Sequence, residues 1–332
     1  MSRAGRVVLV TGAAGFVGGH VAAVLARAGW MVVGCDVRRA PASTAAQRWV
    51  RGDGADPARI AEIAAGAFEA VVLQGAITDT RVPDSAALRE TNTLGPLRIA
   101  AACARSGTRL VYASSHSVYG RLSRRAPIAE GAVADRARCS GPLNAYAVSK
   151  LALDTAMCRS YPGRGAGWVG LRYTNVFGSG EMAKGPMASI LSQLVRGAAV
   201  SGRVRVFADT LTAARDYVPV ETVADTVARL LEEAVPAGVY NLGAGHAVSF
   251  AQLLEWCAGW HGADLVVDLV PNPVAGAYQY YTCADMTALD AVLPGVAVAA
   301  PPDVVREAAA ALFSAFVEQG TAQGRWGSNA GR

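Results

Sequence analysis

The chain has 332 residues, of which 52% are hydrophobic, so it is long and apolar enough to build a large core and is not disordered. Its net charge of +5 is small and its basic residues are scattered, which argues against a nucleic-acid-binding protein. No apolar run reaches the ~18 residues of a membrane span and the six cysteines lack zinc-ligand spacing, so we expect a cytoplasmic protein with no metal.

Short apolar runs alternate with helical patterns through the first half of the chain. The runs have the length and composition of buried parallel strands, and they lie at 6–12, 30–36, 68–76 and 108–115. The segments between them are rich in Ala and Leu at helical spacing, and they lie at 16–28, 57–66 and 84–106. This alternation predicts an α/β fold with a Rossmann-like, doubly wound parallel sheet.

The regular alternation ends near residue 173. We therefore expect a first domain over 1–173 and a smaller C-terminal domain over 174–317, which mainly binds the substrate and has strands that return to the first domain. The later elements with clear patterns are a strand at 238–243, a helix at 249–261 and a strand at 264–270. Residues 318–332 have the composition of a tail.

The first predicted strand runs into a glycine-rich loop, "TGAAGFVG", that opens a helix. Gly12 permits a tight turn, Gly15 lets backbone N–H groups approach a diphosphate, and Gly18 packs the helix against the strand. Phe16 and Val17 lie between these glycines, where the helix starts. The spacing G-x-x-G-x-x-G, placed between strand and helix, predicts that domain 1–173 binds NAD or NADP.

The adenosine ribose of such a cofactor would bind at the end of the second strand. Asp36 stands there, and a carboxylate at this place favours NAD. Arg38 and Arg39 follow directly and could instead pair with the 2′-phosphate of NADP. Asp53 could reach the adenine edge, or it could cap the helix that follows. The pattern favours NAD and leaves NADP open.

Two further motifs indicate acid–base chemistry, "SSHSVYG" at 114–120 and "YAVSK" at 146–150. Tyr146 and Lys150 are four residues apart, so a helix places both on one face. A phenol has a reference pKa near ~10, and a nearby ammonium favours the phenolate and brings it toward a useful range. Ser115 can hydrogen-bond the same substrate hydroxyl. We therefore predict a catalytic set of Ser115, Tyr146 and Lys150.

These motifs, in this order and spacing, resemble the extended short-chain dehydrogenase/reductase family of nucleotide-sugar epimerases and dehydratases. Similar segments continue at 90–96, 171–178, 214–225 and 239–245, so the resemblance covers nearly the whole chain. The family implies an enzyme and a homo-oligomer, with Tyr146 and Lys150 also at the cofactor. Its dehydratases carry an Asp-Glu pair directly after the serine position. His116 and Ser117 stand there in this chain, so dehydration is disfavoured.

"PLNAYAVSK" and "RYTNVFGSGEMAKGPMASI" look more closely like the ADP-heptose 6-epimerase subfamily. That resemblance implies hydride transfer from C6 of an ADP-heptose, a transient 6-ketone and a tightly held cofactor. It also implies that Lys184 faces Tyr146 across the sugar, so that each residue exchanges a proton with one of the two epimers. Only two of the 31 basic residues are lysines, Lys150 and Lys184. The others are arginines, which stay protonated and cannot act as bases.

The remaining candidates have alternatives that the sequence leaves open. The substrate contacts implied by the family are His116, Asn175, Arg215 and Tyr278, and Asn92 is expected to order water near Lys150 at the cofactor. Arg215 would bind the nucleotide diphosphate with its fork of donors, or it could pair with Asp216 instead. Tyr278 could be a core aromatic, His116 a hydrogen-bonded residue without catalytic duty, and Asn92 a residue that turns its helix.

Two other functions stay open. The chain could be an epimerase that acts at C4 of a hexose or heptose, in which case Lys184 would only bind the substrate. It could also be a cofactor-binding protein without catalysis, which the intact Ser115, Tyr146 and Lys150 disfavour.

Overall fold

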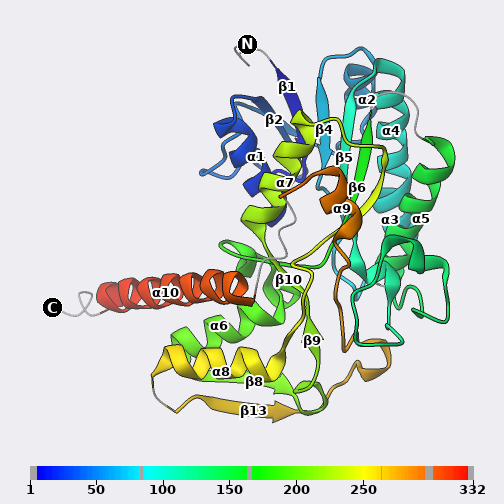
Figure 1. Ribbon diagram of the computed structural model, residues 1–332. Coiled ribbons are helices and arrows are strands. Elements are labelled where there is room, and N and C mark those ends of the chain that lie inside the picture. Colours follow the sequence, from blue (N-terminus) through cyan, green and yellow to red (C-terminus); the bar gives the residue numbers. More distant parts are fainter. Residues whose placement is uncertain (1–5, 83–84, 163–166, 263, 296–301, 328–332) are drawn as a thin grey trace.

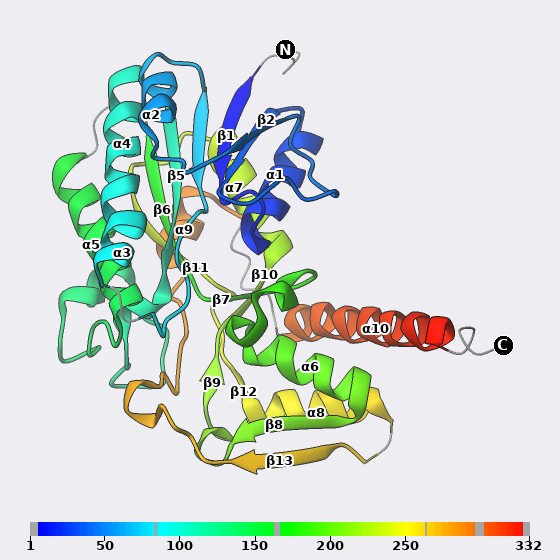
Figure 2. The same cartoon turned by 180° about the vertical axis from the view of Figure 1, so that it is seen from behind.

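The computed structural model describes residues 6–82, 85–162, 167–262, 264–295 and 302–327. Its larger part is built on a sheet with the strand order β11-β6-β5-β4-β1-β2-β3, in which all neighbouring strands are parallel (Figures 1 and 2). The strands are β1 (Val7–Thr11), β2 (Met31–Asp36), β3 (Arg48–Arg51), β4 (Ala70–Leu73), β5 (Arg109–Ser115), β6 (Trp168–Tyr173) and β11 (Gly238–Leu242). The predicted Rossmann-like, doubly wound sheet is confirmed.

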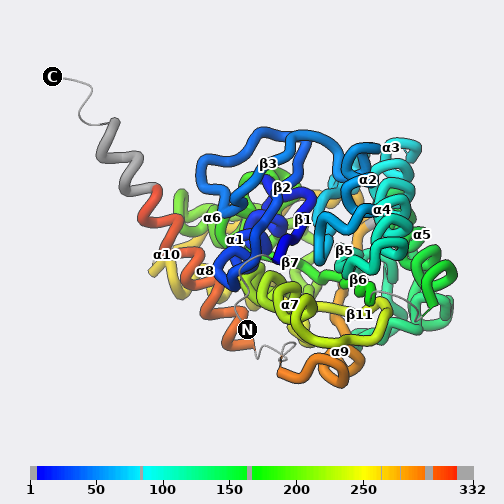
Figure 3. The backbone as a smooth tube through the Cα atoms, turned by 90° about the horizontal axis from the view of Figure 1, so that it is seen from above, coloured from blue at the N-terminus to red at the C-terminus, as the bar shows by residue number. Residues whose placement is uncertain are grey.

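Strand β1 shows why such apolar runs become central strands. Val8, Leu9 and Val10 are all fully buried, because helices cover both faces of the sheet. Successive side chains point to opposite faces, so Val8 and Val10 pack in one core and Leu9 packs in another. The first core includes helices α1 (Phe16–Arg27) and α7 (Val220–Glu232), and the second includes α2 (Pro57–Ala64), α4 (Gly95–Ser106) and α5 (Ala145–Ser160) (Figure 3).

The smaller part of the chain has a hydrophobic core of its own. Helices α6 (Ile190–Ser201) and α8 (Phe250–His261) pack with the parallel strands β8 (Arg203–Phe207) and β13 (Val266–Val270). Helix α10 (Pro302–Gly327) packs against α6 and extends sideways from the molecule (Figure 1). It includes 318–327, where the sequence predicted a tail. An Ala-rich helix, once started, gains one hydrogen bond for each residue added; residues 328–332 lie outside the described part of the chain.

Several segments join the two parts. Strand β11 returns to the main sheet beside β6, and helix α9 (Thr287–Val292) packs against it. The short pairs are β7 (Asn175–Phe177) with β10 (Tyr217–Pro219), and β9 (Ala214–Arg215) with β12 (Val248–Ser249). Helix α3 (Ser85–Arg89) continues through a π-helical turn, Glu90–Leu94, into α4. Within the described residues, every helix is too short or too polar to cross a membrane.

Candidate active site

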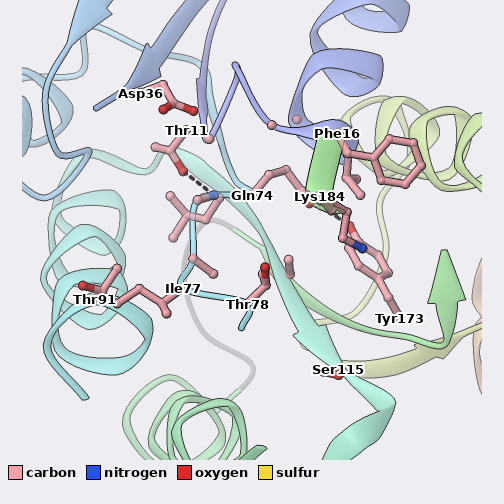
Figure 4. Close-up of a pocket in the computed structure, with 18 of the residues that line it drawn as sticks. Thr11, Phe16, Asp36, Gln74, Ile77, Thr78, Thr91, Ser115, Tyr173 and Lys184 are labelled. Carbon is pink, nitrogen blue, oxygen red and sulfur yellow. Dashed lines mark hydrogen bonds between the residues drawn. The ribbon is translucent and has the colours of Figure 1, made fainter. Parts of the chain in front are cut away.

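The carboxyl ends of five sheet strands open onto one cavity of about 930 Å³ (Figure 4). The last residues of these strands line it: Thr11, Asp36, Leu73, Ser115 and Tyr173. The start of α5 and a segment of the smaller part, within 181–189, complete the wall. Ligands of open parallel sheets bind at this edge, so the cavity is the candidate active site.

The glycine loop forms one end of the cavity. Gly12 has a φ of 66°, and a Cβ atom there would lie 2.5 Å from the Gly75 nitrogen. A Cβ atom on Gly18 would overlap the Gly12 carbonyl oxygen. Gly15 is the N-cap of α1 and has no side chain to cap the first N–H groups of the helix. These groups and the helix dipole favour an anion, so the loop can hold a diphosphate.

Asp36 and Arg38 are paired with each other on the cavity wall. Arg38 Nε and Nη2 lie 3.0 Å from the two carboxylate oxygens of Asp36. The backbone N–H groups of Arg38 and Ala14 donate to the same carboxylate. Burial would raise the pKa of Asp36, but the hydrogen bonds from Arg38 and Ala14 outweigh it and the pKa is lowered. An adenosine ribose would therefore meet an ion pair rather than a free carboxylate.

Helix α5 carries the predicted tyrosine and lysine. The Asn144 side chain caps the helix by accepting a backbone N–H of its first turn. Tyr146 and Lys150 then lie one turn apart, with Lys150 Nζ 6.0 Å from the centre of the Tyr146 ring. The ammonium donates a 2.9 Å hydrogen bond to the Ala113 carbonyl oxygen in β5. Both residues line the cavity, as does Ser115 at the end of β5.

Burial controls the proton affinities of this pair. It lowers the pKa of Lys150 to about 8, although the Asp154 carboxylate one turn along α5 acts in the opposite direction. It raises the pKa of Tyr146, and a hydrogen bond with Ser115 offsets this only in part. The structure thus differs from the expectation that the ammonium lowers the pKa of the phenol, because desolvation is the larger effect at this separation. Burial thus favours the protonated form of Tyr146, which is the form that donates a proton.

Lys184 reaches the same cavity from the smaller part of the chain. It lies in the 3₁₀ turn Glu181–Met187. Its Nζ is 3.3 Å from Glu181 Oε1 and 5.7 Å from the centre of the Phe16 ring in the glycine loop (Figure 4). Its side chain is 33% exposed, so the ammonium is accessible from the cavity. Lys184 and Tyr146 therefore line one cavity from different elements.

The sequence matches the NAD dependent epimerase/dehydratase family over residues 8–243, which is well over half of the chain. The chain belongs to this family. It is similar to an ADP-L-glycero-D-manno-heptose-6-epimerase of Thiobacillus denitrificans, with 31% identity over 246 residues that cover 68% of this chain and 71% of the relative.

Two solved structures extend the comparison. The Helicobacter pylori ADP-L-glycero-D-manno-heptose-6-epimerase has a TM-score of 0.75 and 24% identity, covering 92% of this chain and 97% of its own. At that identity it shows the fold. The UDP-glucose 4-epimerase of Thermus thermophilus, solved in complex with NAD, has a TM-score of 0.70 and 25% identity, covering 93% of this chain and 99% of its own. The protein is an enzyme of the NAD-dependent sugar epimerase family.

The residues of the cavity fit the cofactor of this family. A side chain at Gly12 or Gly18 would collide with the backbone of Gly75 or Gly12, so these glycines maintain the tight turn whose N–H groups would bind the diphosphate of NAD. Phe16 and Val17 line the cavity beside it. Asp53 also lines the cavity, and its Oδ1 accepts the Ala55 N–H at 2.9 Å in a local turn. Asp53 is not the cap of α2, whose N-cap is Asp56.

Besides Arg39, four predicted residues lie outside the cavity lining. His116 is buried, with Nε2 3.2 Å from the Cys283 carbonyl oxygen, and burial lowers its pKa to about 4. Arg215 stacks 5.0 Å from the centre of the Tyr278 ring. Asp216, the alternative partner of Arg215, is buried and accepts backbone N–H groups instead. The expected substrate contacts of His116, Arg215 and Tyr278 are thus not part of the described cavity wall.

Asn92 is the fourth of these residues. It is fully buried, and its amide bonds the backbone N–H and C=O of Ile77, both at 2.9 Å. Its Nδ2 also donates to Ser149 Oγ at 3.1 Å. Asn92 therefore holds the backbone of a cavity-lining residue, and its expected role in ordering water near Lys150 stays a prediction. Asn175 does line the cavity, and its Nδ2 donates to the Asp216 carbonyl oxygen and Thr282 Oγ1.

Sequence reasoning missed two buried carboxylates near the site. Asp154 is buried and accepts hydrogen bonds from Tyr112, Ser114 and Arg172. It is four residues beyond Lys150, and this helical spacing could have indicated it. Glu181 is fully buried and precedes Lys184 by three residues.

Proposed function

We propose that this enzyme inverts C6 of an ADP-glycero-manno-heptose through a transient 6-keto sugar. The observation that carries the proposal is that Tyr146 and Lys184, two groups able to exchange a proton, line the same cavity from different elements. Inversion at a carbon needs acid–base groups that serve both faces of the sugar. The 31% identity to a heptose 6-epimerase supports the choice of substrate and carbon.

In the proposed mechanism, bound NAD would supply the hydride exchange at the sugar carbon. The chain holds the cofactor through the glycine loop and moves the hydroxyl proton. In one direction, the neutral amine of Lys184 removes that proton as the ketone forms, and Tyr146 gives its phenolic proton to the ketone oxygen after the sugar has presented its opposite face. In the reverse direction, the Tyr146 phenolate removes the proton and the Lys184 ammonium returns one. The Lys150 ammonium stabilises the phenolate whenever Tyr146 is deprotonated. Ser115 orients the hydroxyl by hydrogen bonding.

The second candidate is an epimerase that acts at C4 of a nucleotide hexose or heptose. The ion pair of Lys184 with Glu181 and its contact with Phe16 favour this alternative, because they suit a lysine that binds substrate as a cation. Similarity to a UDP-glucose 4-epimerase at 25% identity supports it as well. In that enzyme Tyr146 alone would exchange protons with the substrate.

The experiment that tests the proposal is NMR of ADP-D-glycero-D-manno-heptose incubated with the purified protein. We expect the L-glycero epimer to form, and we expect Lys184→Ala to lower its rate by about 10²-fold or more. Inversion at C4 would establish the second candidate. An unchanged spectrum from a protein that binds NAD would contradict this substrate and leave the family assignment intact.

A further inference from the structure

Glu181 is a carboxylate with no exposed surface, yet it contributes to the wall of the active-site cavity. A buried charge is costly unless donors surround it, and Glu181 has four. Its Oε1 accepts the Ser189 N–H at 2.7 Å and faces Lys184 Nζ at 3.3 Å. Its Oε2 accepts Ser189 Oγ at 2.9 Å and Ser192 Oγ at 2.5 Å. Ser192 is fully buried, whereas Lys184 and Ser189 both line the cavity.

The serines fix Glu181 to a rigid element. Ser189 is the N-cap of α6, and its Oγ accepts the Ser192 N–H at 3.2 Å. A carboxylate is also favoured at a helix N-terminus by the dipole. Behind these contacts, Leu191 and Leu194 bury α6 in the core of the smaller part. Contacts with the start of α6 therefore hold Glu181 in place, independently of what the cavity contains.

The segment that carries Lys184 has no comparable support. Gly180 before it and Gly185 after it have φ values of 83° and 58°, which glycine adopts without strain. A lysine side chain also has many rotamers, so holding it in one place costs conformational entropy. The ammonium is fixed here between the Glu181 carboxylate and the Phe16 ring.

We propose that Glu181 is a positioning residue that holds the Lys184 ammonium at the active-site cavity. This inference rests on the proposed role of Lys184 in proton transfer. Glu181 is buried behind that lysine and does not itself exchange a proton with the sugar. It acts by keeping Lys184 at one position for every turnover.

The first test is a double-mutant cycle measured with ADP-heptose. Glu181→Gln keeps the shape of the side chain, and the serine hydroxyls can still pair with the amide because they donate or accept. We expect kcat to fall about tenfold and KM to stay within about twofold of the wild type, because the variant loses the ordering of Lys184 and not the binding of the substrate. In the Lys184→Ala background the same change should have no further effect. An equal loss of kcat in both backgrounds, or no loss in either, would overturn the proposal.

The second test needs no turnover and uses the fact that the chain has two lysines. Lysine labelled with ¹³C at Cε gives one signal for Lys150 and one for Lys184, which Lys184→Arg assigns. We expect Glu181→Gln to shift and sharpen the Lys184 signal and to leave the Lys150 signal in place. A Lys184 signal that does not change would overturn the positioning role. Absence of C6 inversion by the wild-type protein would instead overturn the proposed function, so the two failures are distinguishable.

Two variants serve as controls. Glu62→Gln breaks an ion pair of the same three-residue spacing, with Arg59 in α2, and should change neither kcat nor the lysine signals. Ser192→Ala removes one donor to Glu181 but keeps its charge. If Glu181→Gln fails to fold, Ser192→Ala should still shift the Lys184 signal, by less and in the same direction. No shift in Ser192→Ala would then count against the proposal.

Discussion

The Lys150 ammonium lies 6.0 Å from the centre of the Tyr146 ring and donates its hydrogen bond to the Ala113 carbonyl oxygen. The two side chains share one face of α5, and burial acts on both, lowering the pKa of the lysine and raising that of the tyrosine. The ammonium is close enough to stabilise a phenolate after Tyr146 has given up its proton. This arrangement suits a tyrosine that gives up its proton in one direction of the reaction and takes one up in the other.

Replacing Tyr146 with Phe removes the phenolic proton and leaves the glycine loop unchanged. We expect turnover to fall by about 10²–10⁴-fold, the usual contribution of a general acid–base group. NAD affinity, measured by titration calorimetry, should stay within about threefold of the wild type, because the diphosphate cradle is unaltered. A variant that retains more than about a tenth of the wild-type turnover would contradict the role of Tyr146.

Replacing Lys150 with Met should make the protein inactive and more stable at neutral pH. The pKa of this lysine falls from 10.5 to about 8 on burial, so the folded state binds fewer protons than the unfolded state between these values. The destabilising effect of the ammonium is therefore complete below pH 8 and disappears as the pH rises toward 10.5. We expect the variant to gain about 1–3 kcal/mol in the free energy of unfolding at pH 7.

The control for Lys150→Met is the same urea titration at pH 10. There the difference between variant and wild type should be smaller than at pH 7, because much of the wild-type lysine is already neutral in the folded state. A difference that is equal at the two pH values would show that packing, and not charge, causes the gain.

Because His116 is buried, we expect the protein to lose stability in mild acid. Burial lowers its pKa from 6.5 to about 4, so the unfolded state binds the extra proton first. The neutral imidazole makes its full contribution to the free energy of unfolding above pH 6.5, and this contribution is lost as the pH falls through 4. His116→Gln should reduce the fall in unfolding free energy between pH 7 and 4.5 by about 2 kcal/mol. Denaturant titrations that give the same pH slope for both proteins would refute this.

Gly18 and Gly19 form a matched pair in the first turn of α1. A Cβ atom on Gly18 would overlap the Gly12 carbonyl oxygen, whereas one on Gly19 would meet only the Ala13 carbonyl oxygen at 3.6 Å. We expect Gly18→Ala to lower the free energy of unfolding by about 1–3 kcal/mol and to abolish the rise in Tm that NAD causes. Gly19→Ala should retain that rise and be neutral or stabilising. Equal behaviour of the two variants would contradict the cradle geometry.

The sequence predicted β1, β2, β4 and β5 because these strands are continuous apolar runs, as in Val8, Leu9 and Val10 of β1. It did not predict β3, where Arg48 and Arg51 flank two residues at the sheet edge, so no apolar run exists. Edge strands are held by backbone pairing, which leaves little trace in side-chain pattern.

The candidate site was predictable where local spacing determines geometry. The glycine loop and the Tyr146–Lys150 pair each lie within one turn or one helix, so spacing alone brings them together. The sequence predicted contacts with the substrate or the cofactor for His116, Arg215 and Asn92. A sequence does not show, however, whether a side chain faces a cavity or the core. Glu181 was missed because a carboxylate three residues from a lysine is usually a solvated pair, and here packing against α6 buries it.

The scarcity of lysine has a practical consequence for handling the protein. Lys150 is buried, with 4% of its surface exposed, while the Lys184 side chain is 33% exposed at the cavity. Among the side chains, reagents that acylate ε-amines will therefore react first at Lys184 in the active site, and the α-amino group of the chain is the other amine that they can modify. Coupling to dyes or resins through lysine will block catalysis. The extent of acylation at Lys184 measures how many protein molecules have an accessible active site. Attachment through the exposed thiol of Cys158 leaves the cavity free.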